Sequence, residues 1–221
     1  MGTVERIWTI AEKQMLMRML NDLQVTCLVD VGANAGQYAR LIRRLGFTGT
    51  IVSFEPNPAV FRTLQQSRAG DPNWKGVNCG LGSEDGELEM NIFEESLISS
   101  FLPGKMVTSK IKEVRKVPVR RLDSVLQEIL PGVAAERIYL KCDTQGFDLQ
   151  VVKGAAGLMR QIVGLQSEIA VKTLYVGMPR YLESLAFYES LGLELMDLWL
   201  VGRTVTGEAM EYDCVMKRAS E

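Results

Sequence analysis

The 221-residue chain contains no histidine. This absence excludes several kinds of active site. Hydrolases with a histidine base, histidine-ligated zinc sites and histidine phosphotransfer all need an imidazole. A general base in this protein must therefore be a carboxylate, a lysine, a tyrosine or a thiolate.

Paired cysteines and long apolar runs are also missing. The four cysteines lie far apart with no C-x-x-C pair, so we expect buried thiols rather than disulfides or metal ligands. No run approaches the roughly 18 apolar residues of a membrane-spanning helix, and charged residues interrupt any signal-peptide core near the N-terminus. We expect a cytoplasmic protein with no stable membrane insertion.

The chain also lacks an excess of positive charge. It has 25 Lys and Arg against 27 Asp and Glu, a net charge of −2, so no overall field attracts nucleic acid, and we expect no nucleic-acid partner. Hydrophobic residues make up 47% and charged residues 24%, which is typical of a packed soluble domain.

Strand-like and helix-like segments alternate along the chain. Apolar runs predict strands, helical periodicity predicts helices between them, and Leu193–Val201 with Met210–Lys217 predict a C-terminal antiparallel hairpin. Such alternation favours a parallel sheet with helices on both faces, in which ligands bind at the carboxyl ends of the strands. The expected strands are 25–31, 50–54, 74–81, 87–93, 137–142 and 162–171, and the expected helices are 37–45, 58–68, 122–130, 149–160 and 179–191.

Two segments stand apart from this alternation. Val4, Trp8, Ala11, Met15, Met19 and Leu23 recur at helical spacing, so residues 1–24 are expected to form a helix that packs on a domain of residues 25–221. Residues 94–121 are the least regular stretch and are expected to form a lid. Residues 105–121 hold seven Lys or Arg and one acid, so they either hold an anionic acceptor or face water and the acidic residues nearby.

The strongest local motif is Asp30-Val31-Gly32-Ala33-Asn34-Ala35-Gly36, where an expected strand meets a helix. Glycines permit a sharp turn and close approach of a ligand. Glu55 ends the next strand, 19 residues after Gly36, close to the spacing of about 20 for an acid that binds ribose hydroxyls. The motif lacks the middle glycine of a dinucleotide site, so an adenosine ligand without pyrophosphate fits it. The alternative is an ordinary turn and a surface acid.

Several blocks resemble the FkbM-type S-adenosylmethionine-dependent methyltransferases. The blocks are VDVGANAGQYA (29–39), VSFEPNP (52–58), VRRLDSVL (119–126), LKCDTQGFDLQVVKGA (140–155), LQSEIAVKTLYVGMP (165–179) and the C-terminal YDCVMK. The resemblance implies an α/β class I methyltransferase (Rossmann-like) fold, with a mostly parallel seven-stranded sheet and a C-terminal antiparallel hairpin.

The resemblance also implies a cofactor, S-adenosyl-L-methionine, and residues that bind it. Glu55 would bind the ribose. The methionine part would lie against the first turn, through Asp30, Gly32, Ala33, Asn34 and Gly36, and the adenine between Pro56 and Leu81. The family commonly has glutamates where this chain has Gln145 and Asp148, so the roles of these two residues stay open.

Methyl transfer to a hydroxyl needs a base, and we expect Asp143 or Glu168 to supply it, with Lys141 paired to one of them and tuning it. Asp143 and Glu168 end two expected neighbouring strands, and Lys141 lies on the same strand face as Asp143. Two adjacent carboxylates raise one pKa and favour a base. The alternatives are a structural Lys141–Asp143 pair with Asp143 capping a helix, or a divalent ion on these carboxylates, although we predict no metal site.

The acceptor is the least defined part of the prediction. We expect an O-methyltransferase that acts on a small molecule or glycan, with a sugar hydroxyl of a glycolipid, polysaccharide or glycosylated natural product as the target. Ser100, Lys172 and Tyr175 are expected to contact this acceptor. The alternatives are an RNA or protein methyltransferase, or a cofactor-binding partner subunit without turnover. The oligomeric state is open, and a homodimer is one possibility.

Overall fold

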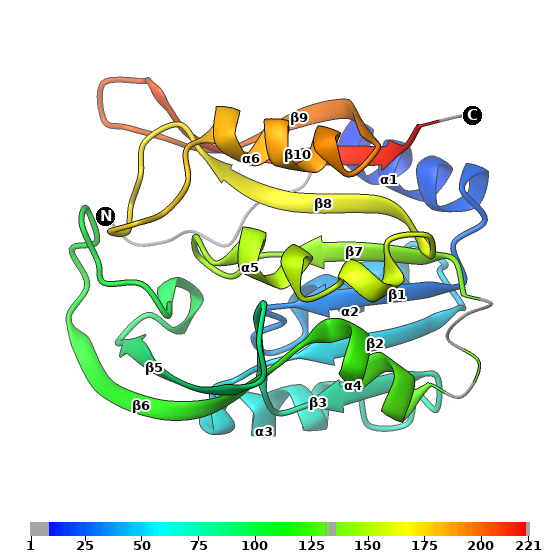
Figure 1. Ribbon diagram of the computed structural model, residues 1–221, viewed down its shortest axis with the longest axis horizontal. Coiled ribbons are helices and arrows are strands. Elements are labelled where there is room, and N and C mark those ends of the chain that lie inside the picture. The colour runs from blue at the N-terminus through cyan, green and yellow to red at the C-terminus, as the bar shows by residue number, and fades with distance from the viewer. Residues whose placement is uncertain (1–8, 131, 133–135, 220–221) are drawn as a thin grey trace.

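A single twisted sheet of seven strands forms the centre of the molecule in the computed structural model, which describes residues 9–130, 132 and 136–219. The strand order is β3-β2-β1-β7-β8-β10-β9 (Figure 1). Strand β10 is antiparallel to both of its neighbours, β8 and β9, and the other pairs are parallel. The expected mostly parallel sheet with a C-terminal hairpin is confirmed. The strands are β1 (Cys27–Val31), β2 (Thr50–Phe54), β3 (Trp74–Val77), β7 (Ile138–Cys142), β8 (Ile162–Ala170), β9 (Leu193–Arg203) and β10 (Ala209–Arg218).

Helices cover both faces of this sheet. One core cluster joins the sheet to α4, α5 and α6, and a second joins it to α1, α2 and α3 (Figure 1). The central strands β1 and β7 are buried at every residue, which explains why they are apolar apart from Asp30 and Lys141. The helices are α1 (Ile10–Asp22), α2 (Gln37–Arg44), α3 (Pro58–Ser67), α4 (Leu122–Ile129), α5 (Asp148–Lys153) and α6 (Tyr181–Ser190).

The N-terminal helix begins at a capping box. The Thr9 hydroxyl accepts the Glu12 amide at 3.1 Å, and the Glu12 carboxylate accepts the Thr9 amide at 2.7 Å. This arrangement satisfies two amides that lack partners within the helix. The helix buries Leu16, Met19 and Leu20 in the second core cluster, whereas Ala11 of the expected stripe is exposed. Val4 and Trp8 lie outside the described residues.

A second, three-stranded sheet corrects the expectation for residues 94–121. Strand β6 (Ile111–Arg120) lies between β4 (Gly80–Leu81) and β5 (Gly86–Phe93). The expectation that 94–121 is irregular is therefore wrong for 111–120. The segment between β5 and β6 contains one short 3-10 helix, Ser96–Ile98, and we call residues 96–102 the strap.

The expected strand 74–81 is two strands that belong to different sheets. The break falls at Asn78, whose side-chain amide donates to the carbonyl oxygens of Glu55 at 2.8 Å and Pro56 at 3.2 Å. These bonds hold the chain against the end of β2. As a result, β4 leaves the large sheet and lies over the carboxyl ends of its strands, where it contributes to a pocket.

All four cysteines are free and buried, as expected. Within the described part of the chain, no helix is both long and apolar enough to cross a bilayer.

Candidate active site

The turn after β1 brings the ends of two strands into direct contact. Gly32 has φ +75°, and a Cβ at this position would lie 1.9 Å from the carbonyl oxygen of Asp143 after β7. Asn34 and Gly36 also have positive φ, at +46° and +83°. Only glycine fits at Gly32, because the backbones approach each other too closely for a side chain.

Glu55 is held by the backbone of the loops beside it. One carboxylate oxygen accepts the Asn34 amide at 2.9 Å and the other accepts the Asn57 amide at 2.8 Å. Burial raises the pKa of Glu55 to about 7, although both amide bonds oppose this shift. Each oxygen keeps one lone pair for a further donor, so Glu55 is a fixed acceptor for hydroxyl groups.

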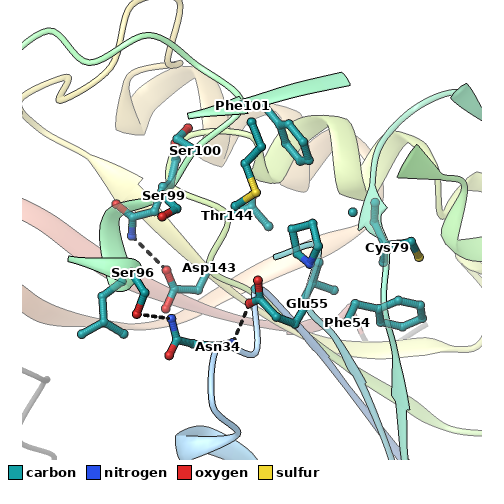
Figure 2. Close-up of a pocket in the computed structure, with 18 residues that line it drawn as sticks. Asn34, Phe54, Glu55, Cys79, Ser96, Ser99, Ser100, Phe101, Asp143 and Thr144 are labelled. Atoms are coloured by element: carbon teal, nitrogen blue, oxygen red, sulfur yellow. Dashed lines mark hydrogen bonds between the residues drawn. The ribbon is translucent and has the colours of Figure 1, made fainter. Parts of the chain in front are cut away.

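A pocket opens at the carboxyl ends of β1, β2 and β7, as expected for an open α/β sheet. Figure 2 shows Glu55 and Asp143 bordering the same space, with Phe101, Ser99 and Ser100 above them. Of the described residues that line it, two are acidic and none is basic. The lining residues are Val31, Gly32, Asn34, Phe54, Glu55, Pro56, Cys79, Gly80, Leu81, Met90, Ser96, Leu97, Ser99, Ser100, Phe101, Asp143, Thr144 and Gln145.

Lys141 is a buried cation between two carboxylates. Its Nζ lies 3.2 Å from Asp143 Oδ2 and 3.5 Å from Asp30 Oδ1. Burial lowers the pKa of Lys141, but the charges of Asp143 and Asp30 outweigh burial and hold that pKa above its usual range. Lys141 therefore stays protonated and does not act as a base.

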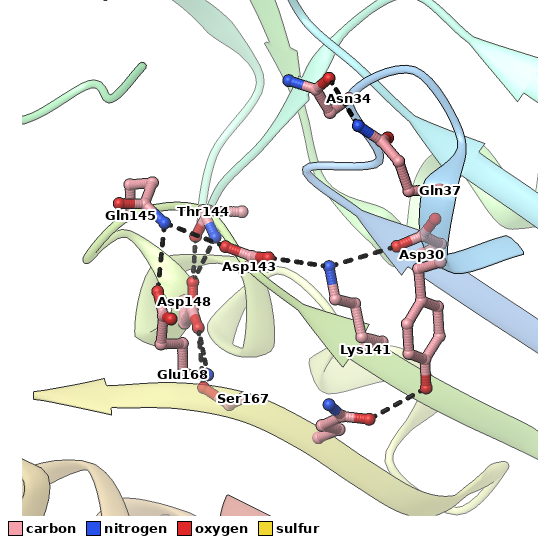
Figure 3. A network of polar contacts seen from close by, with 12 residues as sticks. Asp30, Asn34, Gln37, Lys141, Asp143, Thr144, Gln145, Asp148, Ser167 and Glu168 are labelled. Atoms are coloured by element: carbon pink, nitrogen blue, oxygen red, sulfur yellow. Dashed lines mark hydrogen bonds and ion pairs between the residues drawn. The ribbon is translucent and has the colours of Figure 1, made fainter. Parts of the chain in front are cut away.

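Asp143 and Glu168 are joined by an amide group. Gln145 Nε2 donates to Asp143 Oδ1 and to Glu168 Oε2, each at 3.1 Å (Figure 3). This arrangement follows from the pairing of β7 with β8, which places Cys142 beside Ser167 and thus the next residue of each strand at one edge. The two carboxylates lie together as expected, but only Asp143 lines the pocket.

Two further acids lie behind this pair. Asp148, at the start of α5, accepts the Thr144 amide at 2.8 Å and the Ser167 hydroxyl at 2.8 Å. Burial raises the pKa of Glu211 to about 8. Burial and the charge of Glu211 also raise the pKa of Glu168 well above its usual range. A carboxyl held neutral here is a poor base at neutral pH, so Asp143 is the better candidate.

The remaining predicted residues divide by position. Ser100 lines the pocket and donates its hydroxyl to the Gln145 carbonyl at 2.8 Å. Lys172 lies outside the pocket and pairs with Glu208 at 3.1 Å. Tyr175 is fully buried, and its hydroxyl lies 2.7 Å from the Ile98 carbonyl and 2.9 Å from Gln145 Oε1. Neither Lys172 nor Tyr175 is placed to touch a molecule in this pocket.

Some predicted cofactor residues support the pocket without lining it. Five of the predicted residues line the pocket: Gly32, Asn34, Glu55, Pro56 and Leu81. The other three, Asp30, Ala33 and Gly36, do not line it. A Cβ at Gly36 would lie 2.9 Å from Leu64 and from Trp74, so this glycine serves the packing of α2 and α3 on the sheet.

Sequence reasoning missed the role of Gln145 and several apolar walls. The pocket is lined by Cys79 just before β4, by Met90 on β5 and by Phe101 on the strap. Their placement depends on the second sheet, which the sequence pattern did not reveal. Gln145 stands in the motif that carries the family resemblance, but nothing local shows that its amide lies between two carboxylates. Within the described residues, no cluster of His, Cys, Asp or Glu is arranged to hold a metal ion.

Comparison with known proteins decides the family. Residues 30–187, well over half of the chain, match the family described as the methyltransferase FkbM domain. The chain belongs to this FkbM methyltransferase family. The match begins at Asp30 and includes the turn after β1, Glu55, Asp143 and Glu168.

Two fungal proteins are related in sequence. "Methyltransferase 1" of Beauveria bassiana is 30% identical over 145 residues, which cover 58% of this chain and 57% of the relative. "Methyltransferase sdnD" of Sordaria araneosa is 31% identical over 153 residues, covering 58% of this chain and 59% of the relative. The matched part thus spans less than two thirds of each relative.

Two solved structures show the same fold. A precorrin-6y C5,15-methyltransferase from Geobacter metallireducens has a TM-score of 0.51 at 12% identity, covering 99% of this chain and 94% of that one. An uncharacterised protein from Listeria monocytogenes has a TM-score of 0.52 at 7% identity, covering 97% and 70%. At such identities the likeness concerns the fold, which for the first protein is that of a methyltransferase.

Proposed function

We propose that this FkbM-family protein uses S-adenosyl-L-methionine to methylate a hydroxyl oxygen, and that the hydroxyl belongs to a sugar in a glycolipid, polysaccharide or glycosylated natural product. The observation that carries the proposal is the pairing of Glu55 and Asp143 in one pocket at the carboxyl ends of β1, β2 and β7. One carboxylate is suited to bind a cofactor and the other to receive a proton.

The pocket fits the proposed cofactor in shape and in charge. The close backbone approach at Gly32 leaves a turn without a side chain in the way. Glu55 has a free lone pair on each oxygen for ribose hydroxyls, and Pro56, Cys79 and Leu81 offer an apolar wall for adenine. Two acidic and no basic lining residues suit a ligand with a cationic sulfonium and ammonium.

The chain's own residues then account for the proton. The cofactor, when bound, supplies a methyl group that its sulfonium activates for transfer. As the new O–CH₃ bond forms and the S–CH₃ bond breaks, the acceptor hydroxyl releases its proton, which Asp143 takes. Lys141, 3.2 Å from Asp143, holds one oxygen of this carboxylate in place.

The same lining supports a neutral acceptor rather than an anionic one. A phosphate or carboxylate would meet Glu55 and Asp143 without a compensating lysine or arginine among the lining residues. Ser96 and Ser99 on the strap instead line the pocket with hydroxyl groups, which bind neutral polyols well. The basic residues of β6 lie outside the pocket.

Cofactor binding is tested by calorimetric titration with S-adenosyl-L-methionine. We expect wild type to bind, and Glu55→Gln to bind about 10- to 100-fold more weakly, because hydrogen bonds to a charged group contribute about 1.5–3 kcal/mol. Glu189→Gln is the matched control, since Glu189 is an exposed residue of α6. Absence of binding to wild type, or equal binding by Glu55→Gln, contradicts the cofactor assignment.

The acceptor is tested by mass spectrometry of glycosides, RNA and proteins incubated with enzyme and cofactor. A mass gain of one methyl group on a glycoside, lost in Asp143→Asn, supports the proposal. Methylation of RNA or protein but of no glycoside would replace the sugar acceptor with one of those classes. Tight cofactor binding without turnover on any class would identify a binding subunit instead.

A further inference from the structure

Gln145 has an unusual backbone conformation that fixes its side chain. Its φ is +53°, which non-glycine residues rarely adopt, and Gly146 follows with φ +92°. A Cβ at Gly146 would lie 2.9 Å from Met178 and 3.1 Å from Leu102, so packing on both sides holds this turn. The Gln145 carbonyl also accepts the Ser100 hydroxyl at 2.8 Å. The residue is thus held from the strap and from the loop before α6.

The neighbouring donors and acceptors determine which atoms the Gln145 side-chain nitrogen and oxygen face. The nitrogen lies 3.1 Å from oxygens of both Asp143 and Glu168 (Figure 3). The oxygen lies 2.9 Å from the Tyr175 hydroxyl. The opposite orientation would place a carbonyl oxygen against the Asp143 carboxylate. The amide nitrogen carries two protons, so one serves Asp143 and one serves Glu168. The Tyr175 hydroxyl lies between two acceptors, the Ile98 carbonyl oxygen at 2.7 Å and the Gln145 amide oxygen at 2.9 Å.

We propose that Gln145 is a positioning residue for methyl transfer, which orients Asp143 toward the acceptor and keeps a neutral group between the acids. This inference rests on the proposed function. Asp143 is bound on Oδ1 by Gln145 and on Oδ2 by Lys141. Each oxygen retains a lone pair, so the carboxylate is held from two sides and is still able to accept a proton.

The neutral charge of Gln145 matters because the surroundings are already acidic. The charged and titratable groups around Asp143 are Asp30 on β1, Glu55 after β2, Lys141 on β7, Asp148 on α5, Glu168 on β8, Glu211 on β10 and Tyr175 in the loop before α6. Lys141 is the one cation in this set. A negative charge at position 145 would therefore oppose ionisation of Asp143 directly.

The test compares two substitutions of similar size through the pH profile of kcat. Gln145→Glu removes two donors and adds a carboxyl, so we expect the limb that rises with pH to move at least about one pH unit higher, with about tenfold loss below it. Gln145→Met removes the donors without adding charge, so we expect a loss of about tenfold or more at every pH and a smaller shift of the limb than in Gln145→Glu. Cofactor affinity, measured by calorimetry, should stay at the wild-type level in both.

Two further variants separate position from fold. Gln66→Glu makes the same change at an exposed site on α3 and should keep the wild-type profile. Tyr175→Phe removes the bond to the amide oxygen but leaves position 145 unchanged, and should lower kcat less than Gln145→Met. Thermal unfolding of each variant identifies any that does not fold, in which case Tyr175→Phe decides.

The outcomes distinguish this inference from the proposed function. Wild-type turnover with unchanged kcat and pH profile in Gln145→Glu and Gln145→Met overturns the positioning role alone. If only Tyr175→Phe folds, full activity in that variant has the same effect. Absence of turnover by wild type on every acceptor overturns the proposed function and the positioning role together.

Discussion

The two carboxylates of the pocket are held in different ways. Glu55 accepts two backbone amides from loops that the sheet itself positions. Asp143 is held by two side chains, Lys141 and Gln145, and its own side chain is 41% exposed. A group fixed by the backbone has one geometry and suits binding, whereas a group fixed by side chains is tuned by its neighbours and suits proton transfer.

The strongest test of this difference is removal of the charge at the side-chain-held site. Asp143→Asn keeps the size of the residue but takes away the base, so we expect kcat to fall about 10²- to 10⁴-fold. Cofactor affinity should be retained, because Glu55 and the turn after β1 are untouched. Initial rates with an acceptor that the wild type methylates measure kcat. Calorimetry on the same preparation measures cofactor affinity.

Glu168→Gln serves as the comparison for Asp143→Asn. Glu168 does not line the pocket and meets Asp143 only through Gln145, so its loss of kcat should be smaller. If Asp143→Asn remains fully active and Glu168→Gln does not, Glu168 is the base and Asp143 is not.

The next test concerns the backbone contact between the two halves of the site. Gly32→Ala adds a Cβ at 1.9 Å from the Asp143 carbonyl oxygen, at a φ of +75°. We expect a loss of at least about 2 kcal/mol of folding free energy and a fall in Tm of about 4–8 °C. Differential scanning calorimetry measures this fall, and cofactor titration shows whether binding is lost as well.

Two other glycines separate the causes of that loss. Gly70 has φ +87° but open space around it, and Gly202 has open space without a positive φ. Gly70→Ala therefore reports the backbone strain alone, and Gly202→Ala reports neither effect. Equal Tm values for the three variants would show that the close approach of the β1 and β7 loops does not contribute to stability.

The third test uses the pKa of about 7 that burial gives Glu55. Ribose hydroxyls prefer the ionised carboxylate, so cofactor affinity should rise with pH and level off above about 7, with up to tenfold weaker binding for each pH unit below. Isothermal titrations between pH 5.5 and about 8.5 measure the curve. Glu55→Gln should remove this dependence, and an unchanged curve in that variant would assign the titration to another group.

The raised pKa of Glu55 makes the stability of the cofactor-free protein fall with pH, whereas cofactor affinity rises with pH. Because the pKa of Glu55 is raised above its ordinary value of 4.5, its contribution to stability is complete below that value and is lost as pH rises through about 7. The stabilisation by cofactor, taken as the difference in Tm with and without it, should therefore grow with pH over this window. Other acids titrate nearby, so the comparison with Glu55→Gln isolates the Glu55 contribution.

The sequence predicted the large sheet well because its strands are buried on both faces. β1 and β7 are apolar except for Asp30 and Lys141. Asp30 lies near the end of β1 and Asp143 follows β7, which made the strand ends the natural place to look. β6 was missed because seven of its ten residues are exposed, with charged side chains among isolated apolar ones. Its pairing with β5 across a long connection has no local signature.

The site residues also fall into two groups, those that local sequence patterns reveal and those that meet only after folding. Gly32 and Glu55 were found because backbone geometry demands particular residues at particular spacings. Gln145 was not understood, since the side chains it joins come from β7, β8 and the loop before α6 and meet only after folding. Tyr175 was expected at the acceptor, yet it is buried behind Gln145, because aromatic and polar character alone does not distinguish a ligand contact from a buried support.

The smallest expected effect comes from a side-chain contact to the backbone-held half. Asn34 Nδ2 donates to the Ser96 hydroxyl at 3.1 Å, which ties the strap to the turn after β1. Ser96→Ala removes this bond, whose net contribution is about 1 kcal/mol, so cofactor release should become roughly fivefold faster. Stopped-flow measurement of cofactor dissociation gives the rate, with Ser190→Ala on α6 as the exposed control.

This small effect is informative because it tests whether the backbone-held half depends on any single side chain. The Asn34 and Asn57 amides to Glu55 remain in Ser96→Ala, so the equilibrium position of the carboxylate should not change and kcat should stay at the wild-type value. A fall in kcat comparable with that of Asp143→Asn would mean that the strap positions the reacting groups. In that case the turn after β1 would depend on side chains as much as Asp143 does.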